Sequence, residues 1–569
     1  MKTSSKRGWR VVVVAVWAAV GAAPAWAATG GSAVPGATNG VCQQDATNNI
    51  ACGNGATATN ATGYGVAIGP YSSAGYQAVA SGYDARASGN YSIASGAGAS
   101  ASAAGGTAVG VSSQVTGNAG TAIGNSAAVS GSDGVAVGTS SAASGLDASA
   151  VGYESSASGL YAAAFGVASV ASGNDSLAAG NGSTASGLAS IALGNQSIAN
   201  AQQTSAVGYN STASGLYAST FGAYSIASGN DSTAAGDYSS ASGLASSAVG
   251  NHSLATGDFS TAMGSVSTAS GAASTAIGNY STASGTESTA TGDLATASGN
   301  YATATGEGTN AAGVGDVAVG DTATTKVASG AQTNNNIAIG SAAAKTGGGT
   351  TGPGTTANGG SAIAIGTAAQ ATGLGTIAEG QGAVAQYAGS VAIGAGAQAN
   401  ADPTTALGSN AVANGSNSTA LGANTTANGT NSVALGQGSV ANRDNSVSVG
   451  NAATGLDRQI TNVAPGTAPN DAVNLGQMQG AIETVTGTAR RFADNVGAVS
   501  GAAAAAEAEA AAGQRPNALA LGTSVYNGQG ALAISYQHRF GQHWAGALTV
   551  SSNGGRSDTG VSGAASFSW

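Results

Sequence analysis

The chain has little charge, few aromatic residues and only three histidines. Of its 569 residues, 7% are charged and 5% aromatic, whereas glycine alone supplies 94. This is not the composition of an ordinary globular enzyme. With His252, His538 and His543 as the only imidazoles, no Ser/His/Asp triad is credible despite the abundant serine. We therefore expect no catalytic residue, no cofactor and no enzymatic activity.

Cysteine is also scarce. Cys42 and Cys52 are the only two, and both lie near the N-terminus of an exported chain, which favours a disulfide that closes a small loop at the tip. A metal site would need further Cys or His nearby, and none is present. We therefore expect no metal ligands.

The first residues are typical of a secretion signal. Lys2, Lys6, Arg7 and Arg10 precede the apolar stretch 11–21, and small residues follow, so we expect cleavage between Ala27 and Ala28. A single transmembrane helix is the alternative, but the apolar run is short. Removing the signal leaves 10 Lys+Arg against 24 Asp+Glu. Nucleic acid is an improbable partner for so acidic a chain.

Glycine recurs with a strict period. It occupies every fourteenth position from Gly110 to Gly320, and a second series seven residues out of step, from Gly117 to Gly313, fails only at Ala201. Between the glycines lie short alternating segments such as 121–124 (TAIG) and 135–138 (VAVG). Such short strands and tight turns predict a solenoid whose coils add about 4.8 Å each. The phase breaks in a loop-like stretch that ends in 345–360.

Each coil has few apolar residues to bury. The residue before each glycine is usually apolar but often small, as at Val151, Phe165 and Ala179, which predicts a thin core. Thin cores usually need metal, covalent links or oligomerisation. Calcium-binding rolls repeat G-G-x-G-x-D, but no Asp occupies that register here. We therefore expect oligomerisation.

The head units 432–436 (SVALG) and 446–450 (SVSVG), together with the segment that follows them, resemble trimeric autotransporter adhesins of the YadA type. In that family the following segment is the neck, which leads from a wide trimeric head to a coiled coil. The matching residues are Arg458, Gln459, Ile460, Thr461, Asn462 and Val463, followed by Asp471, Ala472, Val473 and Asn474.

A heptad pattern follows the neck. Apolar residues keep an unbroken spacing of three and four, which predicts a short coiled-coil stalk that ends near Gly513 and Pro516. One amphipathic helix packed on a globular domain is the alternative. The seam residues are Leu475, Met478, Ile482, Val485, Ala489, Phe492, Val496, Val499, Ala503, Ala506 and Ala510.

Four alternating segments complete the sequence. The ranges 517–526, 531–540 and 544–552, and a last strand that ends in Phe567 and Trp569, each have a bulky and a small face. Each is long enough to cross an outer membrane, but four strands cannot close a barrel, whereas twelve strands from three chains can. This block resembles the family's anchor. A soluble antiparallel sheet is the alternative.

The resemblance implies a mostly β fold: a left-handed parallel β-roll head of 14-residue coils, a neck, a short trimeric coiled coil and a 12-stranded outer-membrane β-barrel shared by three chains. We divide the chain into a signal peptide (1–27), an N-terminal tip (28–59), the head (60–450, irregular at about 321–360), the neck (451–475), stalk and pore helix (476–515) and the anchor (516–569).

By the same resemblance, the protein is a homotrimeric adhesin of the outer membrane and cell surface, inserted by the outer-membrane assembly machinery. Its partner is a host cell-surface receptor or an extracellular matrix protein such as collagen, fibronectin or laminin, or a second bacterium in aggregation. A structural or ice-binding solenoid is the main alternative, suggested by Ser-Thr-Ala segments such as 281–283; a secreted hydrolase is a weaker one. No receptor-contacting residue is assigned, although Tyr153, Tyr161, Tyr217 and Tyr238 are candidates.

Overall fold

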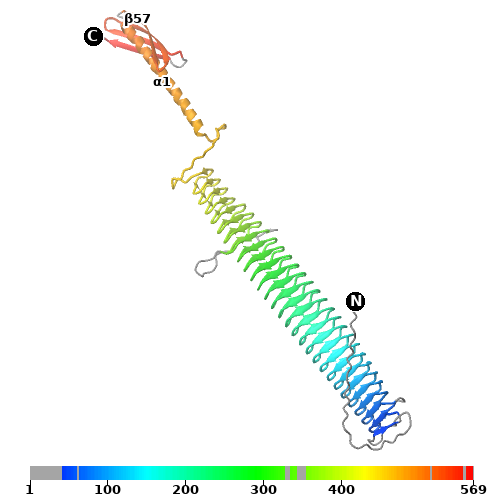
Figure 1. The fold of residues 1–569 in the computed structure, drawn as a ribbon. Coiled ribbons are helices and arrows are strands. Elements are labelled where there is room, and N and C mark those ends of the chain that lie inside the picture. Colours follow the sequence, from blue (N-terminus) through cyan, green and yellow to red (C-terminus); the bar gives the residue numbers. More distant parts are fainter. Residues whose placement is uncertain are drawn as a thin grey trace. The chain divides into compact units, whose positions relative to one another are not determined.

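The computed structural model describes residues 42–45, 47–59, 63–326, 334–342, 354–512, 515–554 and 559–567. The predicted signal peptide and its cleavage site lie outside these ranges. The chain divides into two units, residues 1–457 and 458–569, and each is described by itself (Figure 1).

The first unit is a parallel β-solenoid with two sheets (Figure 1). One sheet consists of three-residue strands: β2 (Ile50–Cys52), β4 (Val66–Ile68) and β6 (Val79–Ser81), then a strand every fourteen residues from β8 (Ile93–Ser95) to β40 (Val317–Val319). It continues with β42 (Ile337–Ile339), the strands from β44 (Ile363–Ile365) to β54 (Val433–Leu435), and β56 (Val447–Ser448). We call it the three-residue sheet.

The other sheet, which we call the two-residue sheet, alternates with the first along the chain. It contains β3 (Thr57–Ala58), β5 (Ser73–Ala74), the strands from β7 (Arg86–Ala87) to β41 (Thr324–Thr325) at intervals of fourteen, and those from β43 (Thr356–Ala357) to β55 (Val440–Ala441). Neighbouring strands pair in parallel in the same register, for example Ala206 with Thr220. The predicted 14-residue parallel coil is therefore confirmed.

The core of the solenoid is made almost entirely of alanine. All members of its buried cluster are alanines except Val115 and Val129. Serines at the turns are also buried, and they hydrogen-bond the glycine carbonyl three residues earlier, as Ser211 Oγ does to Gly208 at 3.1 Å. The interior is thus too narrow for anything larger than small side chains.

The break that the sequence shows at about 321–360 does not interrupt the stack. Strand β42 pairs in parallel with both β40 and β44, so the register of the three-residue sheet continues through this region. Buried polar groups hold this junction. Asp316 accepts hydrogen bonds from the N–H groups of Gly313 and Asn336, both at 2.8 Å, and the Asn336 side chain accepts them from Gly360 and Ala362.

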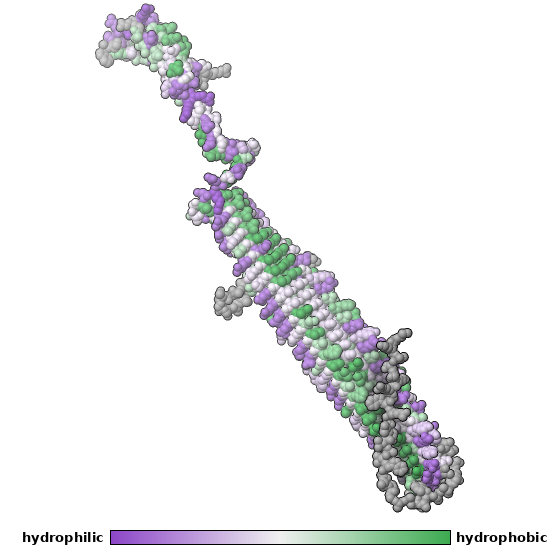
Figure 2. Space-filling model, in the orientation of Figure 1, coloured by the Kyte–Doolittle hydropathy of each residue, from purple (hydrophilic) through white to green (hydrophobic). Residues whose placement is uncertain are grey.

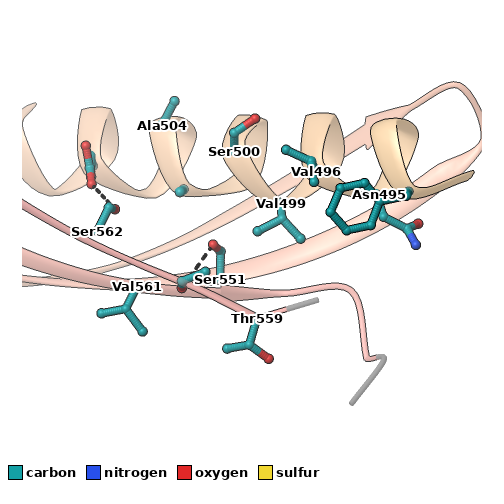
Figure 3. A pocket seen from close by; sticks show the side chains of 13 residues that line it. Asn495, Val496, Val499, Ser500, Ala504, Ser551, Thr559, Val561 and Ser562 are labelled. Atoms are coloured by element: carbon teal, nitrogen blue, oxygen red, sulfur yellow. Dashed lines mark hydrogen bonds between the residues drawn. The ribbon is translucent and has the colours of Figure 1, made fainter. Parts of the chain in front are cut away.

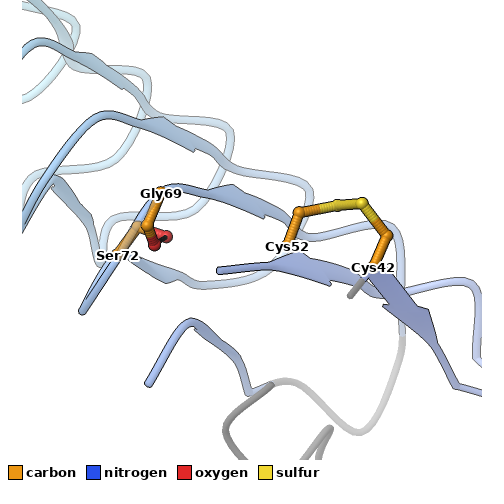
Figure 4. The surroundings of a disulfide bond; sticks show 4 residues. All are labelled: Cys42, Cys52, Gly69 and Ser72. Atoms are coloured by element: carbon orange, nitrogen blue, oxygen red, sulfur yellow. Dashed lines mark hydrogen bonds between the residues drawn. A yellow bond between two sulfur atoms is a disulfide. The ribbon is translucent and has the colours of Figure 1, made fainter. Parts of the chain in front are cut away.

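The described N-terminal residues include the first rungs of the stack. Strand β1 (Cys42–Gln44) pairs antiparallel with β2, and β2 is already a parallel rung paired with β4. A disulfide joins Cys42 to Cys52, which face each other in that pairing (Figure 4). The next turn is held by the bond from Ser72 Oγ to the Gly69 carbonyl, at 2.8 Å.

The second unit contains one helix and a four-stranded antiparallel sheet. Helix α1 (Leu475–Ala512) precedes β57 (Asn517–Tyr526), β58 (Gln529–Arg539), β59 (Trp544–Ser552) and β60 (Thr559–Phe567), which pair in sequence order. Asn527 and Gly528 both have positive φ, +49° and +85°, as a tight hairpin turn needs. Trp569 lies outside the described residues.

Candidate adhesive surface and assembly faces

The outer face of the three-residue sheet is an apolar stripe. The residue before each glycine points outward, not into the core as its apolar character suggested, and Phe221, for instance, is 49% exposed. The residue one position earlier fills the interior instead; it is alanine in almost every coil and Thr220 before Phe221, because the narrow interior takes only small side chains. Figure 2 shows hydrophobic residues gathered in a band along the head. The stripe includes Ile123, Phe165, Phe221, Val249, Met263, Ile277, Ile339, Ile365, Leu407, Leu421 and Leu435.

The outer face of the two-residue sheet is more polar. Its outward positions carry mainly Ser, Thr, Gln or Ala, with single Ile, Leu or Val residues between them. Thr268, Thr282 and Thr296 form a rank on three successive coils, which ends at Leu254 on one side and Asn310 on the other. A continuous threonine face, as an ice-binding surface needs, is therefore interrupted.

One group of aromatic side chains lies at the turns that follow successive three-residue strands. Tyr209, Tyr224, Tyr238 and His252 form a ladder, with successive ring centroids 5.2, 4.7 and 4.9 Å apart. The last three rings are nearly parallel, with interplanar angles of 12° and 10°. A hydrogen bond with Tyr209 raises the pKa of the Tyr224 hydroxyl. This ladder lies on the surface of the solenoid.

The tyrosines that the sequence singled out do not pack within their coils. Tyr153, Tyr161, Tyr217 and Tyr238 are each half exposed or more. None of them enters the interior, which holds small side chains, but Tyr238 packs between Tyr224 and His252 of the neighbouring coils on their outer side. Of the four, the ladder includes only Tyr238.

An asparagine ladder lies farther along the head. The side-chain amides of Asn400, Asn414, Asn428 and Asn442 occupy one position on four successive coils and bond in series, with N–H···O distances of 2.9, 2.9 and 2.8 Å. The ladder ties neighbouring coils together on their exposed side.

The neck contains the hydrogen bonds that start the stalk helix. Asn474 caps α1 by accepting the N–H of Gln477 at 2.9 Å, and the Gln477 amide exchanges two 2.9 Å bonds with the backbone of Gly466. The Asn474 N–H in turn donates to Gln477 Oε1 at 3.3 Å, which completes the reciprocal pattern of a capping box. Sequence analysis named Asn474 but missed Gln477, which the spacing Asn-x-x-Gln could have indicated.

The rest of the predicted neck is a mostly exposed, extended segment. Residues 458–462 are exposed, and Asn462 has a positive φ of +62°. Asp471 closes a turn: the N–H groups of Ala468 and Thr467 donate to its carboxylate at 2.9 and 2.8 Å and lower its pKa. Ala472 and Val473 lead from this turn into the helix cap and are exposed.

The stalk seam is uncovered over its first part. Met478, Ile482 and Phe492 are exposed, whereas the alanine-rich end of α1 is buried against the sheet at Ala498, Ala502 and Ala506. Gly522 of β57 lies where a Cβ atom would collide with the Ala502 carbonyl and the Ala506 amide. Small residues on both elements thus let the helix lie directly on the sheet.

The two faces of the four-stranded sheet differ as the alternation predicted. Ala533, Ser535 and Thr549 are buried on the helix side. The opposite face exposes bulky side chains, namely Leu519, Leu521, Val525, Leu532, Ile534, Tyr536, Trp544, Leu548, Val550, Val561 and Phe567.

An open groove of about 480 Å³ runs between α1 and the edge strand β60 (Figure 3). Phe492, Val496, Val499 and Val561 supply apolar walls. At one end Ser562 Oγ donates to Glu507 Oε1 at 2.7 Å. The strand β60 pairs only with β59, so its other edge forms part of this groove.

Two further properties concern metals and membrane helices. In the part of the chain that the structure describes, no three His, Cys, Asp or Glu side chains come together as a metal site would require. Within the same residues, no helix combines the length and apolar character needed to cross a membrane.

The sequence matches two family models. The model "YadA head domain repeat" matches sixteen times between residues 73 and 453 and covers more than half of the chain. The model "Coiled stalk of trimeric autotransporter adhesin" matches residues 459–501. No curated protein matches the chain.

A solved structure is also similar: the collagen-binding domain of the Yersinia adhesin YadA. It is 21% identical and covers 52% of this chain and 86% of its own, with a TM-score of 0.12. Because this score is so low, the similarity carries no argument about the fold. The assignment to a family therefore depends on the head and stalk models. The chain belongs to the YadA-like trimeric autotransporter adhesins.

Proposed function

We propose that three copies of the chain form an adhesin on the bacterial surface, with no enzymatic activity, whose C-terminal units together make an outer-membrane anchor. The observation that carries this proposal is the four-stranded sheet. It exposes bulky apolar residues on one face, packs small residues on a helix with the other, and leaves an edge of both β57 and β60 unpaired.

An edge in lipid leaves backbone groups without partners, so a sheet of this kind must close. Strands of 9–11 residues suffice to cross the hydrocarbon layer. Twelve strands from three chains would close a barrel around three copies of α1, and the groove beside β60 would receive a neighbouring chain. The uncovered seam of Met478, Ile482 and Phe492 would join the same helices above it.

In this arrangement the anchor is first the pore through which each chain leaves the cell and then its tether. The outer-membrane assembly machinery would insert it, with Phe567 and Trp569 as its terminal aromatic signal. The head holds many copies of the same surface away from the cell, so weak contacts with a host receptor or a matrix protein such as collagen add up to firm attachment. Aggregation between bacteria would use the same multivalency.

The assembly is tested by the mass of the detergent-extracted protein before and after strong denaturation. Three chain masses before and one after are expected; one chain mass at both steps would end the proposal.

Display of the head on the cell surface is tested with Gly522→Leu, which should block the contact between α1 and the sheet and reduce the amount of head on the cell surface. Gly530→Leu is the matched control, because nothing lies within 4 Å of a Cβ at Gly530.

Adhesion is tested by producing the chain in a non-adherent bacterium. Cells should gain attachment to cultured cells or to surfaces coated with collagen, fibronectin or laminin, or should settle faster in suspension. Cells that carry a variant lacking residues 60–450 should gain none of these. A structural or ice-binding solenoid is the alternative, and thermal hysteresis in the full-length protein without any attachment would favour it.

A further inference from the structure

Every coil of the head has two turns, and their central residues form two columns along its length. The first turn follows the three-residue strand and the second follows the two-residue strand. Over six coils the first column holds large side chains at Tyr224, Tyr238, His252, Val266, Tyr280 and Leu294. The second column carries Tyr217, Asp231, Ala245, Phe259, Ala273, Glu287 and Tyr301.

These large residues stand in a backbone conformation that disfavours them. All thirteen have φ between +50° and +60°, which glycine and asparagine tolerate and which a branched residue such as Val266 adopts only with strain. The same chain uses asparagine there in later coils, at Asn410, Asn417, Asn424, Asn431 and Asn445. Strained large residues retained on the surface indicate a contact that repays the strain.

The proposed trimer, on which this inference rests, determines what faces these columns. The apolar stripe on the three-residue sheet must be buried, which turns that sheet toward the threefold axis. Since a threefold interface joins two different surfaces, the first turn column of one chain then meets the second turn column of its neighbour.

The heights of the two columns make them interdigitate. A full coil rises about 4.8 Å, so residues seven apart differ by about 2.4 Å. Each first-column side chain of one chain therefore lies level with a gap between two second-column residues of the next. Tyr238 faces the gap between Asp231 and Ala245, and Tyr280 the gap between Ala273 and Glu287.

The side chains match this geometry. Tyr238 and Tyr280 each face one alanine, which leaves a hollow, and one carboxylate, which can accept the tyrosine hydroxyl, whereas Tyr224 faces Tyr217 and Asp231. Where the second column carries Phe259, the first offers His252 and the smaller Val266. The rings of Tyr224, Tyr238 and His252 also stack face to face, which leaves their edges toward a neighbour.

We infer that the tyrosine column is the seam between the heads of two chains and not a receptor site. The surface left for a ligand is the outer face of the two-residue sheet. This deepens the proposed function by naming which face of the head seals the assembly and which meets the host.

The test is disulfide cross-linking in the full-length protein with Tyr238→Cys and Ala245→Cys together. These positions lie on opposite turns of one coil, so only a neighbouring chain can bring them together. Mild oxidation should give a covalent species of three chain masses on a denaturing gel, and a reductant should return it to one. Leu294→Cys with Glu287→Cys is a second pair, which repeats the test at another height of the head in case the first pair disturbs its own coil.

Ser240→Cys with Ala245→Cys is the matched control, because Ser240 lies in the same coil on the outer sheet face, and it should stay at one chain mass. The proposed seam is refuted if neither pair forms a cross-link in a protein whose undenatured mass is three chains. It is also refuted if the control pair cross-links as well as the test pairs. An undenatured mass of one chain would overturn the proposed trimer instead. Tyr224→Ala with Tyr238→Ala should weaken trimers; loss of attachment with trimers intact would make these residues ligand contacts and refute the inference.

Discussion

Replacing Gly380 by alanine should open the head locally, and the expected size of the effect follows from the backbone. Gly380 follows a three-residue strand with φ +128°, a conformation that side-chain-bearing residues rarely adopt. A Cβ there would lie 2.6 Å from the carbonyl carbon and oxygen of Gly394 on the next coil. Since those atoms belong to backbone held by parallel pairing, they cannot move aside cheaply.

We expect about 2 kcal/mol from the strained backbone and about 2 kcal/mol from the collision. A total of about 4 kcal/mol corresponds to a roughly thousandfold larger local opening constant. Gly382 supplies the matched control only two residues away. Its φ is +64° and nothing lies within 4 Å of an added Cβ, so Gly382→Ala should cost only about 1 kcal/mol.

Native-state hydrogen exchange of the full-length protein measures both variants, because a solenoid opens coil by coil rather than all at once. Amides of the coils around 366–394 should exchange much faster in Gly380→Ala, and distant coils should keep the exchange rates of the unsubstituted chain. Equal exchange in the two variants would refute the reasoning, since it would mean that the approach of neighbouring coils does not require glycine.

Three further predictions concern hydrogen bonds. Asn414→Ala removes two amide bonds of the exposed ladder and should destabilise its coils by about 1 kcal/mol, measured by the same exchange. Gln477→Ala removes the paired bonds to Gly466 and should lower the stability of the first turn of α1 by about 1–2 kcal/mol. The measurement is the loss of hydrogen-exchange protection of the amides in that turn. The lowered pKa of Asp471 means that its turn is fully stabilised above the ordinary value of 3.8 and loses this as pH falls through the lowered pKa. The protection of the Thr467 amide, relative to a free amide at the same pH, should therefore fall in acid.

Each of these has its own control. Asn442→Ala, at the end of the ladder, should cost about half as much as the central substitution, since it removes one hydrogen bond of the ladder instead of two. Asn474→Ser keeps a cap acceptor for α1 and should preserve most of its first turn. Asp471→Asn should abolish the acid dependence; an unchanged pH profile in that variant would assign the titration to another group.

Much of the fold could be predicted from periodicity. A glycine every fourteen residues requires a coil of constant length. The segments 517–526 and 544–552, predicted from the alternation of bulky and small residues, have the same bounds as β57 and β59. The direction in which side chains point could not be read in the same way. In strands of two or three residues, alternation allows either face to point inward, and apolar character favours the wrong face, because the interior holds only small side chains, mostly alanine.

Other features depend on contacts that the one-dimensional pattern does not contain. The interrupted spacing at 321–360 does not show that β42 pairs with both β40 and β44. Backbone pairing, together with buried Asp316 and Asn336, holds this register. Likewise the tyrosines at 224 and 238 lie fourteen residues apart in the sequence, and only the coil brings their rings within 4.7 Å.

The antiparallel strand β1 determines how the stack ends. A parallel stack offers at its last rung a row of free amide and carbonyl groups on which any strand of like spacing could add. By running the other way and being linked through Cys42 to Cys52, β1 removes the matching register at that rung. The disulfide therefore fixes β1 to the rung that it covers, so that along this edge of β2 an antiparallel neighbour takes the place of a parallel one.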